Sequence, residues 1–103
     1  MRQMDNALQY GTTEGLMALF DGGMNIDQTD FQGRTALQLM SFRGKKDVVE
    51  ALIARGANVN ALFMYHRELP KTALDAAQEA ERAEVIEVLL AHGAKTGQEL
   101  QQG

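Results

Sequence analysis

The sequence predicts an all-α protein, a solenoid of about three helix–turn–helix units. Two observations predict this class. Residue types recur at constant spacing along the chain, and each recurring block carries two short apolar stripes at helical spacing, separated by a turn signal. Helices this short are marginal alone, so each unit must bury its stripes against a neighbour. The chain has 103 residues, of which 45% are hydrophobic, and this suits a single domain.

The recurrence has two spacings, and their difference locates an insertion. Three positions recur 33 residues later (44−11, 56−23, 59−26): Gly11 as Gly44, Gly23 as Gly56, and Ile26 as Val59. A second set recurs 37 residues later: Thr35, Leu37, Val49, Leu52 and Gly56 as Thr72, Leu74, Ile86, Leu89 and Gly93. The third unit therefore holds four extra residues (37−33), and we expect them between Asn60 and Thr72.

Each unit is expected to contain two helices. Thr35 followed by Gln38 forms a capping-box pattern that starts a helix, and Phe42-Arg-Gly44 ends it. A second helix is expected over residues 47–54, ended by Gly56. The third unit should repeat this pattern over residues 72–80 and 84–92. Leu52 and Leu89 are then equivalent core positions.

Composition and charge exclude several classes of function. The net charge of −4 gives no basic stripe for nucleic acid. There is no cysteine, so disulfides and zinc–cysteine sites are excluded. No stretch approaches the roughly 18 apolar residues of a membrane span. Residues 1–10 hold no apolar run that would indicate a signal peptide. We therefore expect a cytoplasmic protein.

No set of residues indicates catalysis, so we expect no enzyme activity. His66 and His92 are the only histidines, and neither has a neighbour at metal-ligand spacing. The glycines do not form a phosphate-binding loop, and Ser41 lacks a nucleophile motif. An acidic cluster, formed by Glu79, Glu81, Glu84 and Glu87, is better explained as a solvated helix face than as an acid–base pair. We predict no catalytic residue, no cofactor and no metal.

The repeated blocks resemble a known family. The segment DFQGRTALQLMSFRGKKDVVEALIARGANVNA, residues 30–61, closely resembles an ankyrin repeat, and residues 71–96 resemble a second. Residues 4–27 resemble a degenerate N-terminal repeat. The resemblance implies a solenoid of helix hairpins with β-turn fingers. We expect one domain over residues 1–96, with units at about 4–29, 30–62 and 63–96, followed by a polar, fraying tail over 97–103.

Three positions depart from the family pattern. Family repeats usually carry a proline after the helix-opening threonine and a histidine two residues later. Here Ala36 and Gln38 stand at those places, and then Ala73 and Asp75. Gly44 is replaced by Glu81 in the third unit, which puts the turn between its helices in question.

The resemblance also implies where a partner protein would bind. Ankyrin proteins usually bind through the finger tips and the concave face of their first helices. Glu79 and Ala80 are the third unit's counterparts of Phe42 and Arg43. Carried over by register, together with the inserted finger, the predicted protein-binding residues are Tyr10, Phe31, Gln32, Arg34, Phe42, Arg43, Phe63, Met64, Tyr65, His66 and Arg67.

Two alternatives stay open from the sequence. The inserted finger, residues 62–70, is richer in apolar groups than ordinary loops, which favours an exposed binding patch. In the other reading, Leu62, Phe63 and Leu69 fold back on the domain. Binding another protein as an adaptor, inhibitor or assembly factor is the expected function, and self-association into a homodimer is the alternative.

Overall fold

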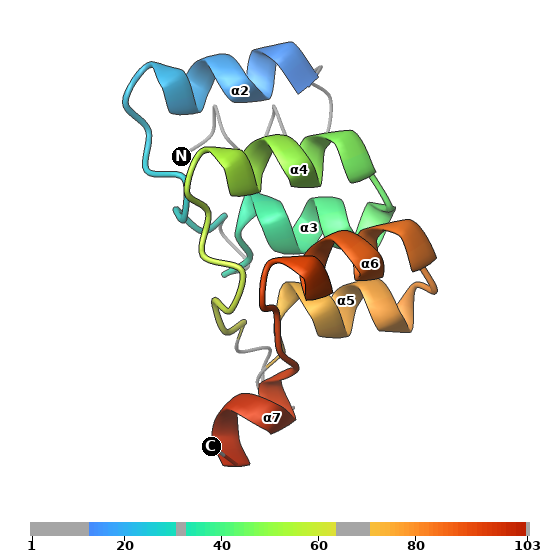
Figure 1. Ribbon diagram of the computed structural model, residues 1–103. Helices are drawn as coiled ribbons and strands as arrows, with labels where there is room; N and C mark the ends of the chain where they lie inside the picture. Colours follow the sequence, from blue (N-terminus) through green and yellow to red (C-terminus); the bar gives the residue numbers. More distant parts are fainter. Residues whose placement is uncertain (1–12, 31–32, 64–70, 103) are drawn as a thin grey trace.

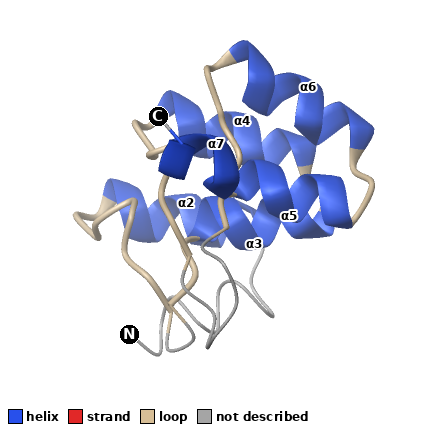
Figure 2. Ribbon diagram, turned by 90° about the horizontal axis from the view of Figure 1, so that it is seen from below, coloured by secondary structure: helices blue, strands red, loops and turns tan. Residues whose placement is uncertain are grey.

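The computed structural model describes residues 13–30, 33–63 and 71–102, and within them all regular secondary structure is helical (Figure 2). The helices are α2 (Thr13–Asp21), α3 (Ala36–Arg43), α4 (Lys46–Ala54), α5 (Ala73–Glu79), α6 (Ala83–Ala91) and α7 (Gly97–Gln102). Extended pairing in these segments is confined to two isolated bridges, Thr29 with Thr35 and Phe63 with Lys71. None of the described helices is long and apolar enough to span a membrane.

The helices stack as repeated hairpins (Figure 1). Helix α3 packs against α4, and α5 packs against α6, which gives two hairpins of the same kind. The hairpins stack through α3 on α5 and through α4 on α6, and α2 packs on the other side of α4. This arrangement confirms the predicted all-α solenoid. The helix bounds agree with the predicted ranges to within one residue at each end.

Helices α3 and α5, the first helices of the two hairpins, each begin with the predicted kind of capping box. The Oγ1 of Thr35 accepts the Gln38 N–H at 3.2 Å, and the Thr35 N–H donates to Oε1 of Gln38 at 2.8 Å. Thr72 and Asp75 make the same reciprocal pair at the start of α5. Each box satisfies backbone donors that the first turn of a helix leaves without a partner.

The turn between the helices survives the loss of its glycine. Gly44 takes a left-handed conformation with φ 75° after α3. Glu81, at the equivalent place after α5, takes φ 57°, which side chains rarely adopt. The next amide closes both turns in the same way, since Lys45 N–H bonds to Met40 O and Arg82 N–H bonds to Ala77 O. The doubt about the third unit's turn was therefore misplaced: the hydrogen bonds hold the residue in that conformation.

The core runs between the helix layers. Leu52 and Leu89 are both fully buried, which confirms their equivalence, and Val49 and Val85 are buried beside them. Met40 is also in the core, with an exposed fraction of 5%. These side chains are the apolar stripes that each unit buries against its neighbour.

The expected fraying of the tail is wrong for residues 97–102, which form α7. Thr96 and Glu99 make a third reciprocal capping pair, with bonds of 3.0 and 3.1 Å. The Gly97 N–H donates to Oδ2 of Asp75 at 2.7 Å, and Thr72 Oγ1 donates to the Lys95 carbonyl at 2.6 Å. These contacts anchor the segment at the start of α5. Composition alone indicated a polar tail because it does not show these bonds.

Candidate protein-binding surface

Four of the predicted binding residues lie in the described segments: Arg34, Phe42, Arg43 and Phe63. The other seven lie outside the described residues: Tyr10, Phe31, Gln32, Met64, Tyr65, His66 and Arg67. The described four come from two fingers and from the end of α3. Their positions decide which side chains are available to a partner.

The second unit's finger is closed by its own ion pair. The guanidinium of Arg34 contacts Oδ2 of Asp30 through Nη2 at 3.0 Å and through Nε at 3.1 Å. The Arg34 backbone N–H donates to Oδ1 of the same carboxylate at 2.9 Å. The Asp30 side chain is 2% exposed, and that of Arg34 is 26% exposed. Arg34 thus fixes the base of the finger, a structural role that its position in the sequence did not reveal.

The third unit's finger is closed by backbone bonds at the equivalent place. Phe63 N–H donates to Lys71 O at 2.6 Å, and Lys71 N–H donates to Phe63 O at 3.0 Å. Asp30 N–H donates to Arg34 O in the same way at 2.8 Å, so Phe63 and Lys71 correspond to Asp30 and Arg34. Residues 64–70 lie inside one pair where residues 31–33 lie inside the other. The four inserted residues therefore fall between Phe63 and Lys71.

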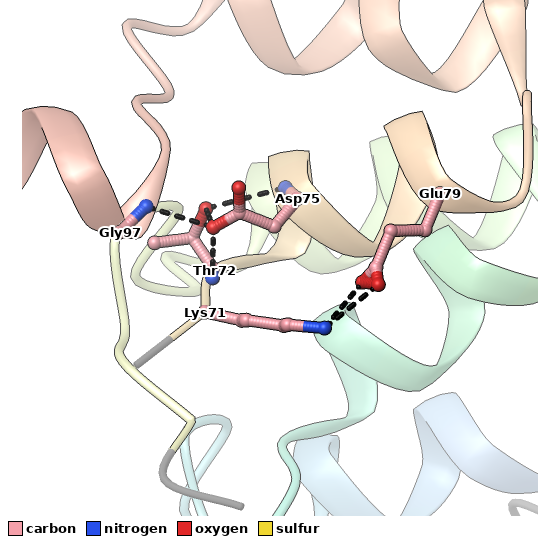
Figure 3. A network of polar contacts seen from close by, with 5 residues as sticks. All are labelled: Lys71, Thr72, Asp75, Glu79 and Gly97. Atoms are coloured by element: carbon pink, nitrogen blue, oxygen red, sulfur yellow. Dashed lines mark hydrogen bonds and ion pairs between the residues drawn. The ribbon is translucent and has the colours of Figure 1, made fainter. Parts of the chain in front are cut away.

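The third finger has Phe63 where the second finger has Asp30, so its basic side chain, Lys71, pairs with a different carboxylate. Lys71 Nζ contacts both carboxylate oxygens of Glu79, at 2.8 and 2.9 Å, and so spans α5 from the finger base to the last turn (Figure 3). Glu79 is the counterpart of Phe42 in register. The last turns of the two first helices therefore present different chemistry: an aromatic ring on α3 and an ion pair on α5.

Among the described residues of this surface, Phe42 is the exposed aromatic. Its exposed fraction is 52%, whereas every other residue of α3 up to Ser41 is buried. Its carbonyl accepts a hydrogen bond from Arg82 Nε at 3.1 Å. The Arg82 side chain lies over Gly44, where an added Cβ would be 2.7 Å from the Arg82 Cδ. Arg82 of the third unit thereby fixes the end of α3 that carries Phe42.

Leu62 and Phe63 begin the third finger. Their exposure bears on the alternative in which the inserted finger folds back on the domain. Leu62 is 46% exposed, so it does not fold back on the domain as that reading required. Phe63 is partly buried. Leu69 lies outside the described residues. An apolar side chain therefore stands in solvent at the entry to the finger.

The described residues offer recognition chemistry. No group of three or more His, Cys, Asp or Glu residues in the described segments is placed to hold a metal ion. The Ser41 Oγ is buried, with no hydrogen-bond partner. A hydrogen bond from Arg55 lowers the pKa of the Asp21 carboxyl and raises that of the Arg55 guanidinium, and this exposed pair joins α2 to α4. The described surface presents three large exposed apolar side chains, Phe42, Leu62 and Leu90, together with charged pairs.

Sequence reasoning located Glu79 by register but missed Lys71 and Arg82. Lys71 directly precedes the capping threonine, as Arg34 does, so the register carried a signal for it. Arg82 has no such signal. Its counterpart Lys45 has a different side chain, and the contact crosses from one unit to the next.

Comparisons with known proteins place the chain in one family. A family model described as ankyrin repeats (3 copies) matches residues 4–99. The chain is 35% identical to serine/threonine-protein kinase 12 of Arabidopsis thaliana over 85 residues, 82% of this chain and 18% of that protein. It is 35% identical to the probable E3 ubiquitin-protein ligase XBOS34 of Oryza sativa subsp. japonica over 88 residues, 84% and 17% of the two chains.

A third relative is more similar over a shorter segment. Ankyrin repeat protein OPG189 of monkeypox virus is 57% identical over 37 residues, 36% of this chain and 7% of that protein. The chain spans less than a fifth of each of these relatives. The family match nevertheless covers nearly the whole chain and agrees with the stacked hairpins. The chain therefore belongs to the ankyrin-repeat family.

Proposed function

We propose that this protein binds another protein through its fingers and through the exposed ends of α3 and α5, as an adaptor, inhibitor or assembly factor. Ankyrin repeats are general protein–protein interaction modules, and this gives the class of function. The finer role is our proposal. It rests on how the described residues present their side chains.

The exposure of Phe42 carries the proposal. A ring that is half in solvent at the end of an otherwise buried helix has no role in the core. Aromatic residues are enriched in the buried anchors of interfaces, because a rigid ring gives a large contact area at low entropic cost. Arg43 follows it, and Arg82 holds the carbonyl of Phe42. The ring is thus offered from a fixed backbone.

The two finger bases support the same surface. The third is closed by two backbone hydrogen bonds between Phe63 and Lys71. The second is closed by one backbone hydrogen bond, from Asp30 N–H to Arg34 O, and by the Asp30–Arg34 ion pair. A loop held at its base loses less conformational freedom when it binds. We propose that Met64, Tyr65, His66 and Arg67 contact the partner from the longer finger, with Phe31 and Gln32 from the shorter finger and Tyr10 from the first unit.

The test uses two finger variants and a control. In one variant the third finger is shortened by four residues between Phe63 and Lys71, which restores the length of the second finger. In the other, Met64, Tyr65, His66 and Arg67 become serine at unchanged length. The control is Glu50→Ser, at an exposed position on α4. Each is used to capture partners from an extract of the source organism, with identification by mass spectrometry.

We expect both finger variants to lose the proteins that the wild type captures, while the control retains them. Thermal stability should change little in the shortened variant, because loop length has a small effect on closure entropy. Unchanged capture by both variants would remove the finger from the binding surface. Loss in the shortened variant alone would assign the effect to loop length and not to the side chains.

A further inference from the structure

Helix α2 ends on a dipeptide that is chemically labile. Asp21 is followed by Gly22, and this is the only Asp–Gly step of the chain, which has no Asn–Gly step. In such a step the backbone nitrogen of the glycine can attack the side-chain carboxyl carbon, because glycine has no Cβ to hinder the approach. Every other Asp or Asn of the chain is followed by a residue with a side chain. The sequence therefore singles out one position for this reaction.

The folded structure holds both reacting groups in hydrogen bonds. Gly22 N–H donates to Ala18 O at 2.9 Å, which extends the bonding pattern of α2. The Asp21 carboxylate accepts two bonds from Arg55, from Nε to Oδ1 at 3.0 Å and from Nη2 to Oδ2 at 3.3 Å. The attack requires the nitrogen to leave Ala18 and the carboxyl carbon to turn towards it. Both sets of bonds must therefore open first.

Arg55 belongs to the next unit, where it ends α4. Its Nη1 also donates to Ala51 O on that helix, at 3.3 Å, so the guanidinium is held in place from α4. The hydrogen bond from Arg55 lowers the pKa of the Asp21 carboxyl. At neutral pH a lower pKa leaves less of the neutral acid, which is the form that the nitrogen attacks. Arg55 thus hinders the reaction both by geometry and by charge.

The pair is nevertheless open to water and weakly held. The Asp21 side chain is 60% exposed, and that of Arg55 is 36% exposed. Exposed ion pairs contribute little and open readily. Gly23, with φ 110°, follows directly and ends the helical conformation, and helix ends fray. The reaction is therefore slowed in the folded protein and not prevented.

We propose that Asp21–Gly22 is a site of spontaneous isoaspartate formation and that Arg55 keeps this reaction slow. The Gly22 nitrogen bonds to Cγ of Asp21, its proton leaves with the carboxyl hydroxyl as one water molecule, and a cyclic imide forms. Hydrolysis adds one water and breaks one of the two bonds from the nitrogen to a carbonyl carbon. Cleavage at the original peptide carbonyl leaves the main chain running through Cβ and Cγ, with a free α-carboxylate. Water is the only co-reactant, and nothing is oxidised or reduced.

The product weakens the attachment of the first unit. Its main chain has one more atom before Gly22, so the bond to Ala18 O no longer fits the helix, and the carboxylate sits on Cα instead of Cγ, away from Arg55. A second tie between the same two units lies elsewhere, since Asn58 N–H donates to Oδ1 of Asp27 at 2.8 Å. That tie supplies a matched control, because it can be removed without touching Asp21.

The test follows isoaspartate at residue 21 while the purified full chain is incubated at neutral pH and physiological temperature. Peptides are analysed by electron-transfer fragmentation, which distinguishes the two linkages. Arg55→Met removes the donors, and Arg55→Lys keeps the charge with a single donor group. Gly22→Ala blocks the attack and leaves Gly23 to form the turn. Asp27→Ala loosens the units with the ion pair intact, and thermal denaturation checks that each variant is folded.

We expect slow accumulation in the wild type and accumulation several-fold faster in wild-type chain kept unfolded in urea. Arg55→Met should also react several-fold faster than the wild type, with Arg55→Lys between the two. Gly22→Ala should form no isoaspartate, and Asp27→Ala should react as the wild type does. Both Arg55 variants should fold, because the side chain is exposed.

Three results would overturn the proposal. Absence of isoaspartate at residue 21 in both the folded and the unfolded wild type would remove the site. Equal rates in the wild type and in both Arg55 variants would remove the protecting role of Arg55. Equal acceleration by Asp27→Ala and Arg55→Met would mean that Arg55 acts only by holding the two units together.

Discussion

In the second unit Asp30 holds Arg34 inside the finger, whereas in the third unit Phe63 takes the place of Asp30 and Lys71 reaches along α5 to Glu79. One backbone bond at the finger base is common to both, from the Asp30 N–H to Arg34 O and from the Phe63 N–H to Lys71 O. The reciprocal donor differs, since the Lys71 N–H donates to Phe63 O and the Arg34 N–H donates to the Asp30 carboxylate. The units differ in the carboxylate that pairs with the basic side chain of the finger: Asp30 for Arg34, and Glu79 for Lys71. With an apolar residue in place of the acid at the finger base and Glu79 in place of Phe42, the basic side chain of the third unit pairs at the end of α5, where the second unit presents an aromatic ring.

The helix starts show a second difference of the same kind. Gln38 uses its Oε1 for the Thr35 N–H and its Nε2 to donate to the Ala61 carbonyl at 2.9 Å. Asp75 has no donor, and its carboxylate accepts from Gly97 N–H instead. Both side chains thus join a helix start to the segment that follows its hairpin. The partner switches from a carbonyl to an amide because the side chain has switched from an amide to an acid.

The largest expected effect compares the two core leucines. Leu52→Ala and Leu89→Ala should each lower the free energy of unfolding by about 2–5 kcal/mol, since both side chains are fully buried. Leu52 should be the more costly, because among the described helices α4 packs between α2 and α6, whereas α6 has such a neighbour only on its α4 side. Urea denaturation measures both. Losses below about 0.5 kcal/mol at both sites, the range of ordinary surface substitutions, would mean that the register is wrong.

The finger cations should differ in their contribution to stability. Asp30→Asn removes the charge from a buried carboxylate that Arg34 contacts, and we expect a loss of about 1–3 kcal/mol. Glu79→Gln breaks the more exposed Lys71 pair and should cost about 0–1 kcal/mol. Thermal denaturation of the two variants, prepared side by side, gives the comparison. Equal losses would show that the two fingers are held alike.

The smallest expected changes in the free energy of unfolding are at the turn between the two helices of each hairpin, and they should have opposite signs in the two units. Glu81→Gly should stabilise the protein by about 1 kcal/mol, because a left-handed conformation is unfavourable for a residue with a Cβ. Gly44→Ala introduces that cost and also crowds Arg82, so it should destabilise by about 1–2 kcal/mol. Chemical denaturation of both variants tests the pair. Destabilisation by Glu81→Gly would mean that the Glu81 side chain makes a contact worth more than the backbone strain.

The sequence predicted the helices well because their signals are local. Thr35 with Gln38 specifies a helix start within four residues, and apolar spacing sets which face is buried. The candidate site was less predictable because its contacts depend on the closed fold. The binding role predicted for Arg34 stays a prediction, whereas its ion pair could not be predicted, since only the folded finger brings Asp30 against it. The Arg82 contact joins two units, and it has room only because residue 44 is a glycine with no Cβ.

The binding role of the stack is tested most directly by the affinity of a captured partner for wild-type protein and for Phe42→Ser. Isothermal titration gives both values, and the thermal midpoint should be unchanged because Phe42 is outside the core. We predict binding at least roughly tenfold weaker in the variant, the effect expected of an aromatic anchor. An unchanged affinity at unchanged stability would contradict the assignment of the α3 end to the binding surface.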